Sequence, residues 1–291
     1  KKNKKNIFNF YFIMKKYPLG IKFVKSNTNE KIISFNKKTL RRNKVERIKI
    51  ICAAFLVFAI ATSWSAQADV REVFICNYLD GKDMGDMMSA RDYYLKQAKK
   101  AGIDVPNSFV WTPYKTSSST SDLLWFSNYE NLAAFAATAD AQAASAEMVA
   151  VQARFDSVVK CTSSLGTRNL IFDGGGLDVT PPAIITSNAC NLKPGVGAAE
   201  LEDLWGHVRA TLGGMEEYKN GVFYSHTPIT SSSTTPDLFL YGVSDTVTDW
   251  ANKRAAFAAS QAGPSLGRHF QAVMECNNSL WMGQRVIPPQ E

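Results

Sequence analysis

The sequence is poor in the residues and spacings from which metal sites are built. It contains three histidines and five cysteines, and no two of the cysteines stand at C-x-x-C spacing. Structural zinc sites usually contain such pairs. Only one long apolar run occurs, at residues 50–61, and it is shorter than the roughly 17 to 25 residues of a membrane-spanning helix. These absences exclude a zinc-ribbon protein and a membrane protein with several spans.

Acidic residues are scarce in the first part of the chain. Residues 1–68 hold 16 of the 33 Lys and Arg but only 2 of the 26 Asp and Glu, so they carry +14 and the remaining residues carry −7. A basic chain ordinarily suggests a nucleic-acid partner. Here the basic charge belongs to a segment that we expect to be removed. The sequence therefore predicts no nucleic-acid binding by the mature protein.

The expected removal rests on the order of features before residue 69. A basic stretch at 37–49 precedes the apolar run, and the small residues Ala66 and Ala68 follow it. This is the order of a secretory signal peptide. We predict a signal peptide at 45–68, cleaved after Ala68, with no stable membrane insertion afterwards. Residues 1–44 show no helical or strand periodicity, and we interpret them as an upstream, non-native or disordered segment.

The rest of the chain contains an internal repeat with an offset of 114 or 115 residues. The matching segments are Cys76-Asn77 with Cys190-Asn191, Trp111-Thr112-Pro113 with His226-Thr227-Pro228, Asp122-Leu123 with Asp237-Leu238, Phe155 with Phe270, and Cys161 with Cys276. This many identities in one order are hard to obtain by chance. We predict two copies of one domain, at 69–176 and 182–291.

Both copies show the same pattern of elements. The first reads as a strand at 70–79, a helix at 84–101, strands at 109–114 and 123–128, a helical stretch at 131–160 broken near Ala144, and a strand at 169–172. The second reads as 184–191, 198–212, 222–229, 238–243, 247–275 and 280–287. The order β-α-β-β-α-β is that of a ferredoxin-like domain. Pro113 and Pro228 fall inside the second strand, which fits a strand at a sheet edge.

Four cysteines remain after cleavage, at equivalent places in the two copies. Cys76 and Cys190 lie in the first strands, and we place Cys161 and Cys276 at the ends of the last helices. Four cysteines in an exported protein imply two disulfides with three possible connectivities. Repeat symmetry favours Cys76 with Cys161 and Cys190 with Cys276. Four buried free thiols and a zinc site are the alternatives.

A tandem of such units resembles the dimeric α+β barrel superfamily, broadly the antibiotic-biosynthesis monooxygenase and NIPSNAP types. The resemblance rests on element order and on the internal repeat, and it covers the whole mature sequence. It implies an α+β fold in which two ferredoxin-like repeats pack as an intramolecular dimeric α+β barrel. The precedents it supplies include haem-degrading monooxygenases and the haem-binding chlorite dismutase type. None of their functional motifs can be placed on this chain.

All three histidines, His207, His226 and His269, lie in the second copy. A haem would need a histidine that faces a cavity, and His269 on the last helix is the candidate, its alternative being an exposed helical residue. His226 replaces Trp111 in the second strand. It is a candidate ligand or acid/base residue, and the alternative is a polar side chain at a strand surface. His226 and His269 are the weak catalytic candidates.

Aromatic and amide residues on the predicted strands suggest a pocket for a small ligand. Asparagine in the first strand of both copies is not the residue that packing would choose, although a strand-edge hydrogen bond would also explain it. The predicted ligand-binding residues are Asn77, Trp111, Trp125, Asn191, His226 and Tyr241. Large aromatics also serve as core residues, and that alternative stays open.

The sequence thus predicts a periplasmic or secreted, disulfide-stabilised protein that binds a small apolar or aromatic molecule without demonstrable catalysis. No cofactor is predicted, with haem as the alternative. A monooxygenase-like or haem-binding oxidoreductase is the second hypothesis, and a structural or interaction protein is the third. The sequence does not decide whether the protein is an enzyme, and it gives no oligomeric state.

Overall fold

The computed structural model describes residues 69–116, 121–175, 182–230 and 235–289. The predicted signal peptide at 45–68 and the segment at 1–44 lie outside the described residues. Of the helices described, none is both long and apolar enough to cross a membrane.

Each repeat has the predicted order of elements. The first consists of β1 (Asp69–Tyr78), α3 (Met84–Ala101), β2 (Asn107–Thr116), β3 (Leu123–Tyr129), α4 (Leu132–Ala144), α5 (Ala146–Asp156) and β4 (Val159–Asp173). The second consists of β5 (Ala183–Leu192), α6 (Ala198–Gly213), the 3-10 turn η2 (Glu216–Tyr218), β6 (Val222–Pro228), β7 (Leu238–Ser244), α7 (Val247–Ala259), α8 (Ala262–Val273) and β8 (Met274–Ile287). The helical stretch of the first repeat is interrupted, as predicted, after Ala144, where Ser145 caps α5.

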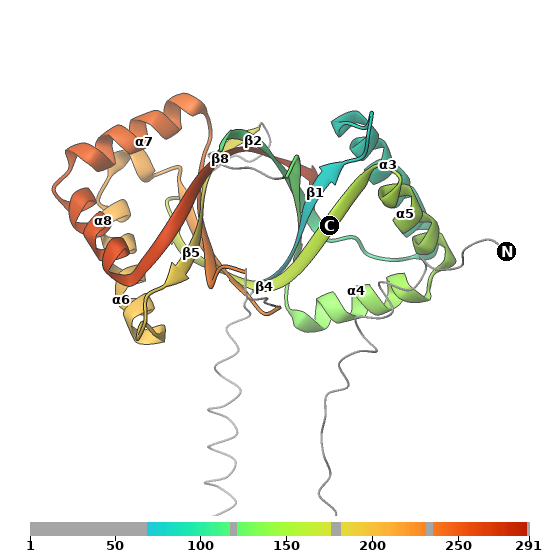
Figure 1. Ribbon diagram of the computed structural model, residues 1–291, viewed down its shortest axis with the longest axis horizontal. Helices are drawn as coiled ribbons and strands as arrows, with labels where there is room; N and C mark the ends of the chain where they lie inside the picture. Colours follow the sequence, from blue (N-terminus) through green and yellow to red (C-terminus); the bar gives the residue numbers. More distant parts are fainter. Residues whose placement is uncertain (1–68, 117–120, 176–181, 231–234, 290–291) are drawn as a thin grey trace, which may run out of the picture. The chain divides into compact units, whose positions relative to one another are not determined.

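The eight strands close into one barrel in the order β1-β3-β2-β8-β5-β7-β6-β4, and every pairing is antiparallel. The two repeats join at two seams, where β4 pairs with β6 and β2 pairs with β8. Figure 1 shows α3, α4 and α5 outside one part of the ring and α6, α7 and α8 outside the opposite part. The predicted fold class, two ferredoxin-like repeats packed as an α+β barrel within one chain, is confirmed.

The last strand of each repeat begins earlier than the sequence predicts. β4 begins at Val159 and β8 at Met274. Cys161 and Cys276 therefore lie within strands, and their predicted place at helix ends is wrong. After the buried Val159 and Met274, both strands continue with four exposed residues, which give no apolar alternation, so a pattern-based prediction misses them.

Both disulfides that repeat symmetry favours are present. Cys76 is bonded to Cys161 and Cys190 to Cys276, and in each pair the Cα atoms are 4.1 Å apart. The partners stand directly opposite each other in the ladders of β1 with β4 and of β5 with β8. Each bond ties the first strand of a repeat to its last.

The second strand is not an edge strand, because the barrel is closed. β2 pairs with both β3 and β8, and Pro113 stands opposite Trp281. The register shifts between Pro113 and Lys115. Such an irregularity accommodates a residue that cannot donate a ladder hydrogen bond. Pro228 is the last residue of β6, where it disturbs the pairing least.

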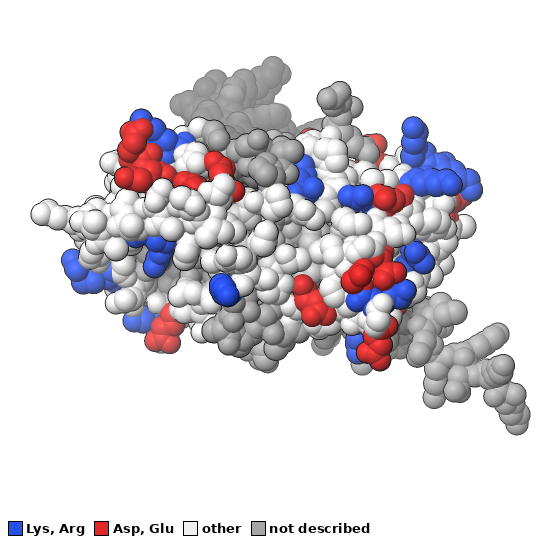
Figure 2. Space-filling model, turned by 90° about the horizontal axis from the view of Figure 1, so that it is seen from above, with Lys and Arg blue, Asp and Glu red and all other residues white. Residues whose placement is uncertain are grey.

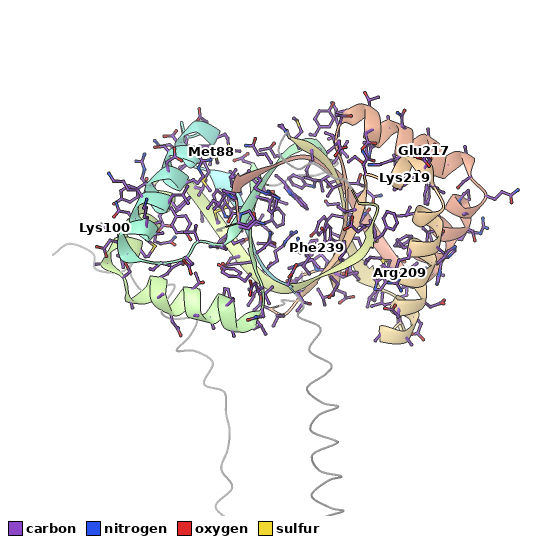
Figure 3. All side chains as sticks on the ribbon, turned by 180° about the vertical axis from the view of Figure 1, so that it is seen from behind. Met88, Lys100, Arg209, Glu217, Lys219 and Phe239 are labelled. Atoms are coloured by element: carbon purple, nitrogen blue, oxygen red, sulfur yellow. A yellow bond between two sulfur atoms is a disulfide. The ribbon has the colours of Figure 1, made fainter. Side chains whose placement is uncertain are left out.

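Three apolar clusters form the core. Two lie between a sheet and its helices, one around Met87 and Leu123 and the other around Leu204 and Leu240. The third contains strand residues only, from both repeats, so it lies inside the barrel. We call this interior the lumen. Its most buried apolar members are Val73, Trp111, Phe126, Ile185, Tyr241 and Trp281. Figure 3 shows side chains projecting into the ring of strands, with Phe239 among them.

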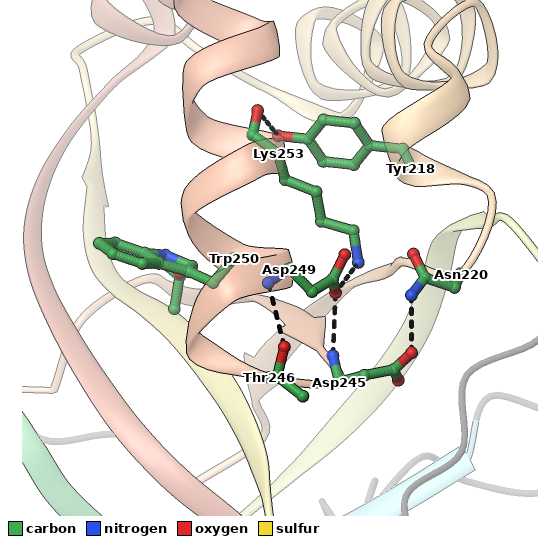
Figure 4. Close-up of polar contacts among 8 residues, drawn as sticks. Tyr218, Asn220, Asp245, Thr246, Asp249, Trp250 and Lys253 are labelled. Atoms are coloured by element: carbon green, nitrogen blue, oxygen red, sulfur yellow. Dashed lines mark hydrogen bonds and ion pairs between the residues drawn. The ribbon is translucent and has the colours of Figure 1, made fainter.

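A polar network holds helix α7 in the second repeat. The Nζ of Lys253, which is 3% exposed, lies 2.6 Å from the Oδ2 of Asp249. The same oxygen accepts a hydrogen bond from the backbone N–H of Asp245 at 3.0 Å (Figure 4). The residues 115 positions before Asp249 and Lys253, in α4, are the uncharged Ala134 and Thr138, and α4 buries none of its residues. Because the buried ammonium is paired with a carboxylate, we assign this network a structural role.

Candidate functional site

A buried arginine lies inside the lumen. Arg71 of β1 is 4% exposed, and its Nε donates a 2.7 Å hydrogen bond to the Oδ1 of Asn128 on β3. Its guanidinium lies between two rings, 5.1 Å from the centroid of Phe126 and 5.0 Å from that of Tyr241. Burial lowers the pKa of Arg71 to about 10, so the side chain stays charged at neutral pH. Its partners are therefore one amide oxygen and two aromatic faces.

A second arginine lies on β4, at the seam with β6. The Arg168 guanidinium forms an ion pair with Asp69 and stacks 4.9 Å from the ring centroid of Tyr224. Tyr224 stacks in turn on Tyr241, with centroids 5.0 Å apart. The Asp69 side chain is 43% exposed and that of Arg168 only 19%. Asp69 therefore lies at the solvent end of the pair and Arg168 at the end nearer the lumen.

His226 of β6 stands directly opposite Arg168 in the ladder. It is 2% exposed, so its predicted alternative as a polar surface residue is wrong. A Cβ on Gly166 would lie 2.5 Å from two atoms of the His226 ring, and the absence of a side chain there makes room for the imidazole. Burial, with the positive charges of Arg71 and Arg168, lowers the pKa of His226 to about 3. The imidazole is therefore neutral, with one donor and one acceptor nitrogen.

Polar atoms of these residues are left without partners. Within the described part of the chain, no well-placed hydrogen-bond partner is found for the Nη1 of Arg71, the Nδ2 of Asn128, the Nε of Arg168, both ring nitrogens of His226 or the hydroxyl of Tyr241, although that hydroxyl lies close to both guanidinium groups. Burying an unpaired polar group costs roughly 1 to 3 kcal/mol. We call the residues from which this cluster is built the polar wall: Asp69, Arg71, Asn128, Arg168, Tyr224, His226 and Tyr241.

The repeat places an apolar residue at the equivalent of every one of these positions. The equivalents, 114 residues away in the first strand of each repeat and 115 elsewhere, are Ala183, Ile185, Val243, Gly283, Phe109, Trp111 and Phe126. We call them the apolar wall. The ladder registers agree with this correspondence, since Arg168 faces His226 at one seam and Gly283 faces Trp111 at the other. The two walls share a backbone and differ in chemistry.

The structure brings together three of the six predicted ligand-binding residues. Trp111, His226 and Tyr241 face the lumen, and the rings of Trp111 and Tyr241 are 5.2 Å apart. Trp125 belongs instead to the layer between the first sheet and its helices. Asn77 and Asn191 are exposed near the ends of β1 and β5. The six residues do not form one site, because neighbouring positions on a strand face opposite sides of the sheet and the two asparagines lie past the buried stretch.

Sequence reasoning missed Arg71 and Arg168. The signal was present in the repeat, because an arginine aligned with an isoleucine or a glycine marks a position where packing alone does not require the charge. The sequence also contains a G-x-S-x-G segment at 263–267. In a nucleophile elbow the serine follows a strand, whereas Ser265 lies inside α8, which follows α7. The segment is not an elbow.

The other two histidines meet on the outside of the second repeat. The Nδ1 atoms of His207 on α6 and His269 on α8 are 3.1 Å apart, and the Nε2 of His269 lies 3.7 Å from the Oδ2 of Asp203. These residues line a shallow surface pocket with Glu202 and Gly206. The expected alternative for His269, an exposed helical residue, is replaced by a partly buried histidine that pairs with His207.

The described residues do not fit a haem. In the relatives implied by the resemblance, a histidine must face the cavity that holds the haem. Here the layer between the second sheet and its helices is filled by side chains such as Leu204, Leu240 and Leu266. His269 faces His207 and Asp203 instead, and His226 lies among the packed rings of the lumen. We therefore derive no chemistry through haem.

Comparison with known proteins identifies the fold. No protein-family model matches the sequence, and no curated protein matches it. A candidate monooxygenase from Fusobacterium nucleatum subsp. nucleatum has a similar structure, with a TM-score of 0.50 and 11% identity over 76% of this chain and 94% of that one. The chain has the dimeric α+β barrel fold.

Two further structures are similar at lower scores. An anthrone oxidase-like protein has a TM-score of 0.48 and 10% identity over 76% of this chain and 94% of that one. A candidate chlorite dismutase has a TM-score of 0.46 and 10% identity over 75% of this chain and 94% of that one. Identities this low describe a shared fold and transfer no activity.

Proposed function

We propose that this chain is an exported protein that binds a small molecule inside its barrel, at the polar wall. One observation carries the proposal: Arg71, His226 and Tyr241 are more than nine-tenths buried and keep side-chain atoms without a well-placed hydrogen-bond partner. Folded proteins pair almost all such groups. A resident ligand would supply the missing partners.

Export is supported by the covalent structure. Two disulfides in one chain are typical of proteins that mature in an oxidising environment. We therefore propose the periplasm or the extracellular space as the site of action, consistent with the leader features of residues 45–68 in the sequence.

A small molecule is favoured over a macromolecular partner. On the face seen in Figure 2, positive and negative side chains are interspersed, and neither sign forms a continuous area. Nucleic-acid binding generally uses a continuous basic surface. The unpaired groups lie in the lumen, where a nucleic acid or a protein does not reach them.

The oxidoreductase hypothesis is the weaker one. It is supported by the shared fold alone, and the described residues do not form a haem site. A purely structural protein would leave the unpaired atoms of the polar wall unexplained. Binding without demonstrable catalysis is therefore the function that the geometry supports best.

Native mass spectrometry and an absorption spectrum of the protein purified from its own host would test the proposal. We expect the mature chain with two disulfides plus the mass of one small molecule. That added mass should disappear in an Arg71→Ile, Asn128→Val double variant, which copies the Ile185 and Val243 pair of the apolar wall. Apoprotein alone, under conditions that preserve weak complexes, would contradict the proposal. A Soret band would favour the haem hypothesis in its place.

A further inference from the structure

The charge of the polar wall is not balanced. Arg71 and Arg168 are both cationic, and Asp69 pairs with Arg168 at the solvent end. Arg71 has neutral partners, namely Asn128, Phe126 and Tyr241. A buried charge is costly unless an opposite charge or strong hydrogen bonds offset it. The lumen therefore carries an excess of one positive charge among the groups of this wall.

The unpaired atoms are mainly donors. The Nη1 of Arg71 and the Nε of Arg168 can only donate a hydrogen bond. The Tyr241 hydroxyl and one nitrogen of the neutral His226 ring can donate as well. With the unpaired Nδ2 of Asn128, five potential donors and a net positive charge match an acceptor that carries negative charge. A guanidinium in particular fits a planar carboxylate or a similar oxyanion.

The surrounding rings limit the size of this acceptor. Trp111 packs against Phe126 with centroids 4.2 Å apart, and Tyr224 packs against Tyr241 at 5.0 Å. A bulky molecule would have to displace these rings, so a group no larger than a carboxylate is favoured. The apolar wall offers no comparable place, since the indole N–H of Trp111 is its one side-chain donor and none of its residues carries a charge.

We infer that the polar wall binds a small monovalent oxyanion, with the carboxylate of a small organic acid as the preferred form, through Arg71, Arg168, Tyr241 and His226. This inference rests on the proposed function and narrows its ligand from a small molecule to an anion. The same donors would also bind an inorganic anion such as nitrate, so the test includes organic and inorganic anions. The inferred anion also replaces the apolar or aromatic ligand that was expected from the sequence.

Isothermal titration calorimetry of the mature, disulfide-bonded protein in a chloride-free zwitterionic buffer provides the test. The probes are sodium formate, sodium acetate, sodium nitrate and the neutral isostere acetamide. We expect acetate or formate to bind at least tenfold more tightly than acetamide. Tighter binding of nitrate would support an inorganic anion at the same donors. Acetamide binding as tightly as the anions would overturn the inference.

Three variants assign the binding to the polar wall. Arg71→Gln should weaken anion binding at least tenfold, and Tyr241→Phe, which copies the equivalent Phe126, should weaken it severalfold without removing the ring. Arg209→Gln removes the same charge from the exposed α6 surface, and it should change affinity less than twofold. Circular dichroism and a thiol assay establish that each variant is folded and oxidised. Unchanged binding in both lumen variants would overturn the inference.

These results separate the two proposals. If a neutral molecule co-purifies and is lost in the Arg71→Ile, Asn128→Val variant while no anion competes with it, the lumen is a binding site and the anion inference is wrong. If neither a co-purified molecule nor an anion binds, both proposals are wrong.

Discussion

The two walls of the lumen have nearly the same backbone and opposite chemistry. At one seam Arg168 faces His226, and at the other Gly283 faces Trp111 in the same register. The apolar wall shows that this barrel can close around hydrophobic side chains and glycine. The arginines of the polar wall are therefore not required by the fold, and their burial has to be explained by something that the apolar wall does not do.

The layers outside the barrel differ in a similar way. In the first repeat Glu72 lies on the helix side of β1, close to Tyr129 and Tyr94. The equivalent residue in the second repeat is Thr186, which accepts a 3.0 Å hydrogen bond from the indole of Trp250. The repeats thus agree in strands and disulfides and diverge wherever an ionisable group is buried.

Both repeats contain an equivalent disulfide. Of the changes considered, removing a disulfide should have the largest effect on the free energy of unfolding. The bonds close segments with sequence separations of 85 and 86 residues. Loop entropy depends weakly on length, so Cys76→Ala with Cys161→Ala and Cys190→Ala with Cys276→Ala should each lower the free energy of unfolding by about 2 to 4 kcal/mol. Urea denaturation of both variants checks this. Costs that differ by more than about 2 kcal/mol would show that the two repeats contribute unequally.

Glu72 should make stability depend on pH, and Thr186 cannot do so. Burial raises the pKa of Glu72 from 4.5 to about 7. The folded state therefore favours the protonated form, so its contribution is fully present below pH 4.5 and is lost as the pH rises through 7. The loss amounts to at most about 3 kcal/mol. Glu72→Gln should flatten the stability profile across this range.

Denaturation curves at several pH values measure that effect. Glu130→Gln, which removes an exposed carboxylate, is the matched control. The idea fails if the wild-type protein and the Glu72→Gln variant lose stability in parallel between pH 4.5 and 7.

Converting one polar pair into its apolar equivalent should stabilise the protein while it abolishes binding. Arg71→Ile with Asn128→Val reproduces the Ile185 and Val243 pair, which already stand opposite each other in β5 and β7. Replacement of buried charged groups by packed apolar residues is often neutral or stabilising, here by about 1 to 2 kcal/mol. The melting temperature without ligand checks this. A clear destabilisation would show that the polar wall serves the fold, which weakens the case for a ligand.

The sequence was sufficient to predict the parts of the molecule in which the repeats agree. The recurring cysteines predicted both disulfides, and the common pattern of strands and helices predicted the ferredoxin-like order. The strand boundaries of β4 and β8 were wrong because the buried Val159 and Met274 are each followed by four residues that are exposed on both faces. Local hydrophobic periodicity does not reveal a strand that is stabilised mainly by hydrogen bonds to its neighbouring strands.

The candidate site could not be predicted, because it depends on barrel closure. His226 looks like a surface residue when β6 is treated as the edge of its own repeat. It becomes buried because β4 of the other repeat pairs with β6, and that pairing also places Arg168 beside it. Arg71 reads as an ordinary polar residue of an alternating strand until the opposite side of the sheet is known to be enclosed.

Gly166 and Gly283 face the lumen, one at each seam, and replacing them gives the comparison of the seams with the smallest expected effect. A Cβ on Gly166 would lie 2.5 Å from the backbone oxygen of Thr227 as well as from the His226 ring, and neither can move easily. A Cβ on Gly283 would overlap the Cδ1 at the end of the Ile185 side chain and lie 3.0 Å from the Trp111 ring, so side chains rather than backbone would have to move. Overpacking typically costs about 1 to 3 kcal/mol, so Gly166→Ala should destabilise the protein by roughly 1 kcal/mol more than Gly283→Ala. Urea denaturation of the two variants measures the difference. If Gly283→Ala lowers the free energy of unfolding as much as Gly166→Ala does, the apolar wall is as rigid as the polar wall. Rigid placement of side chains would then not be a property that sets the polar wall apart as a binding site.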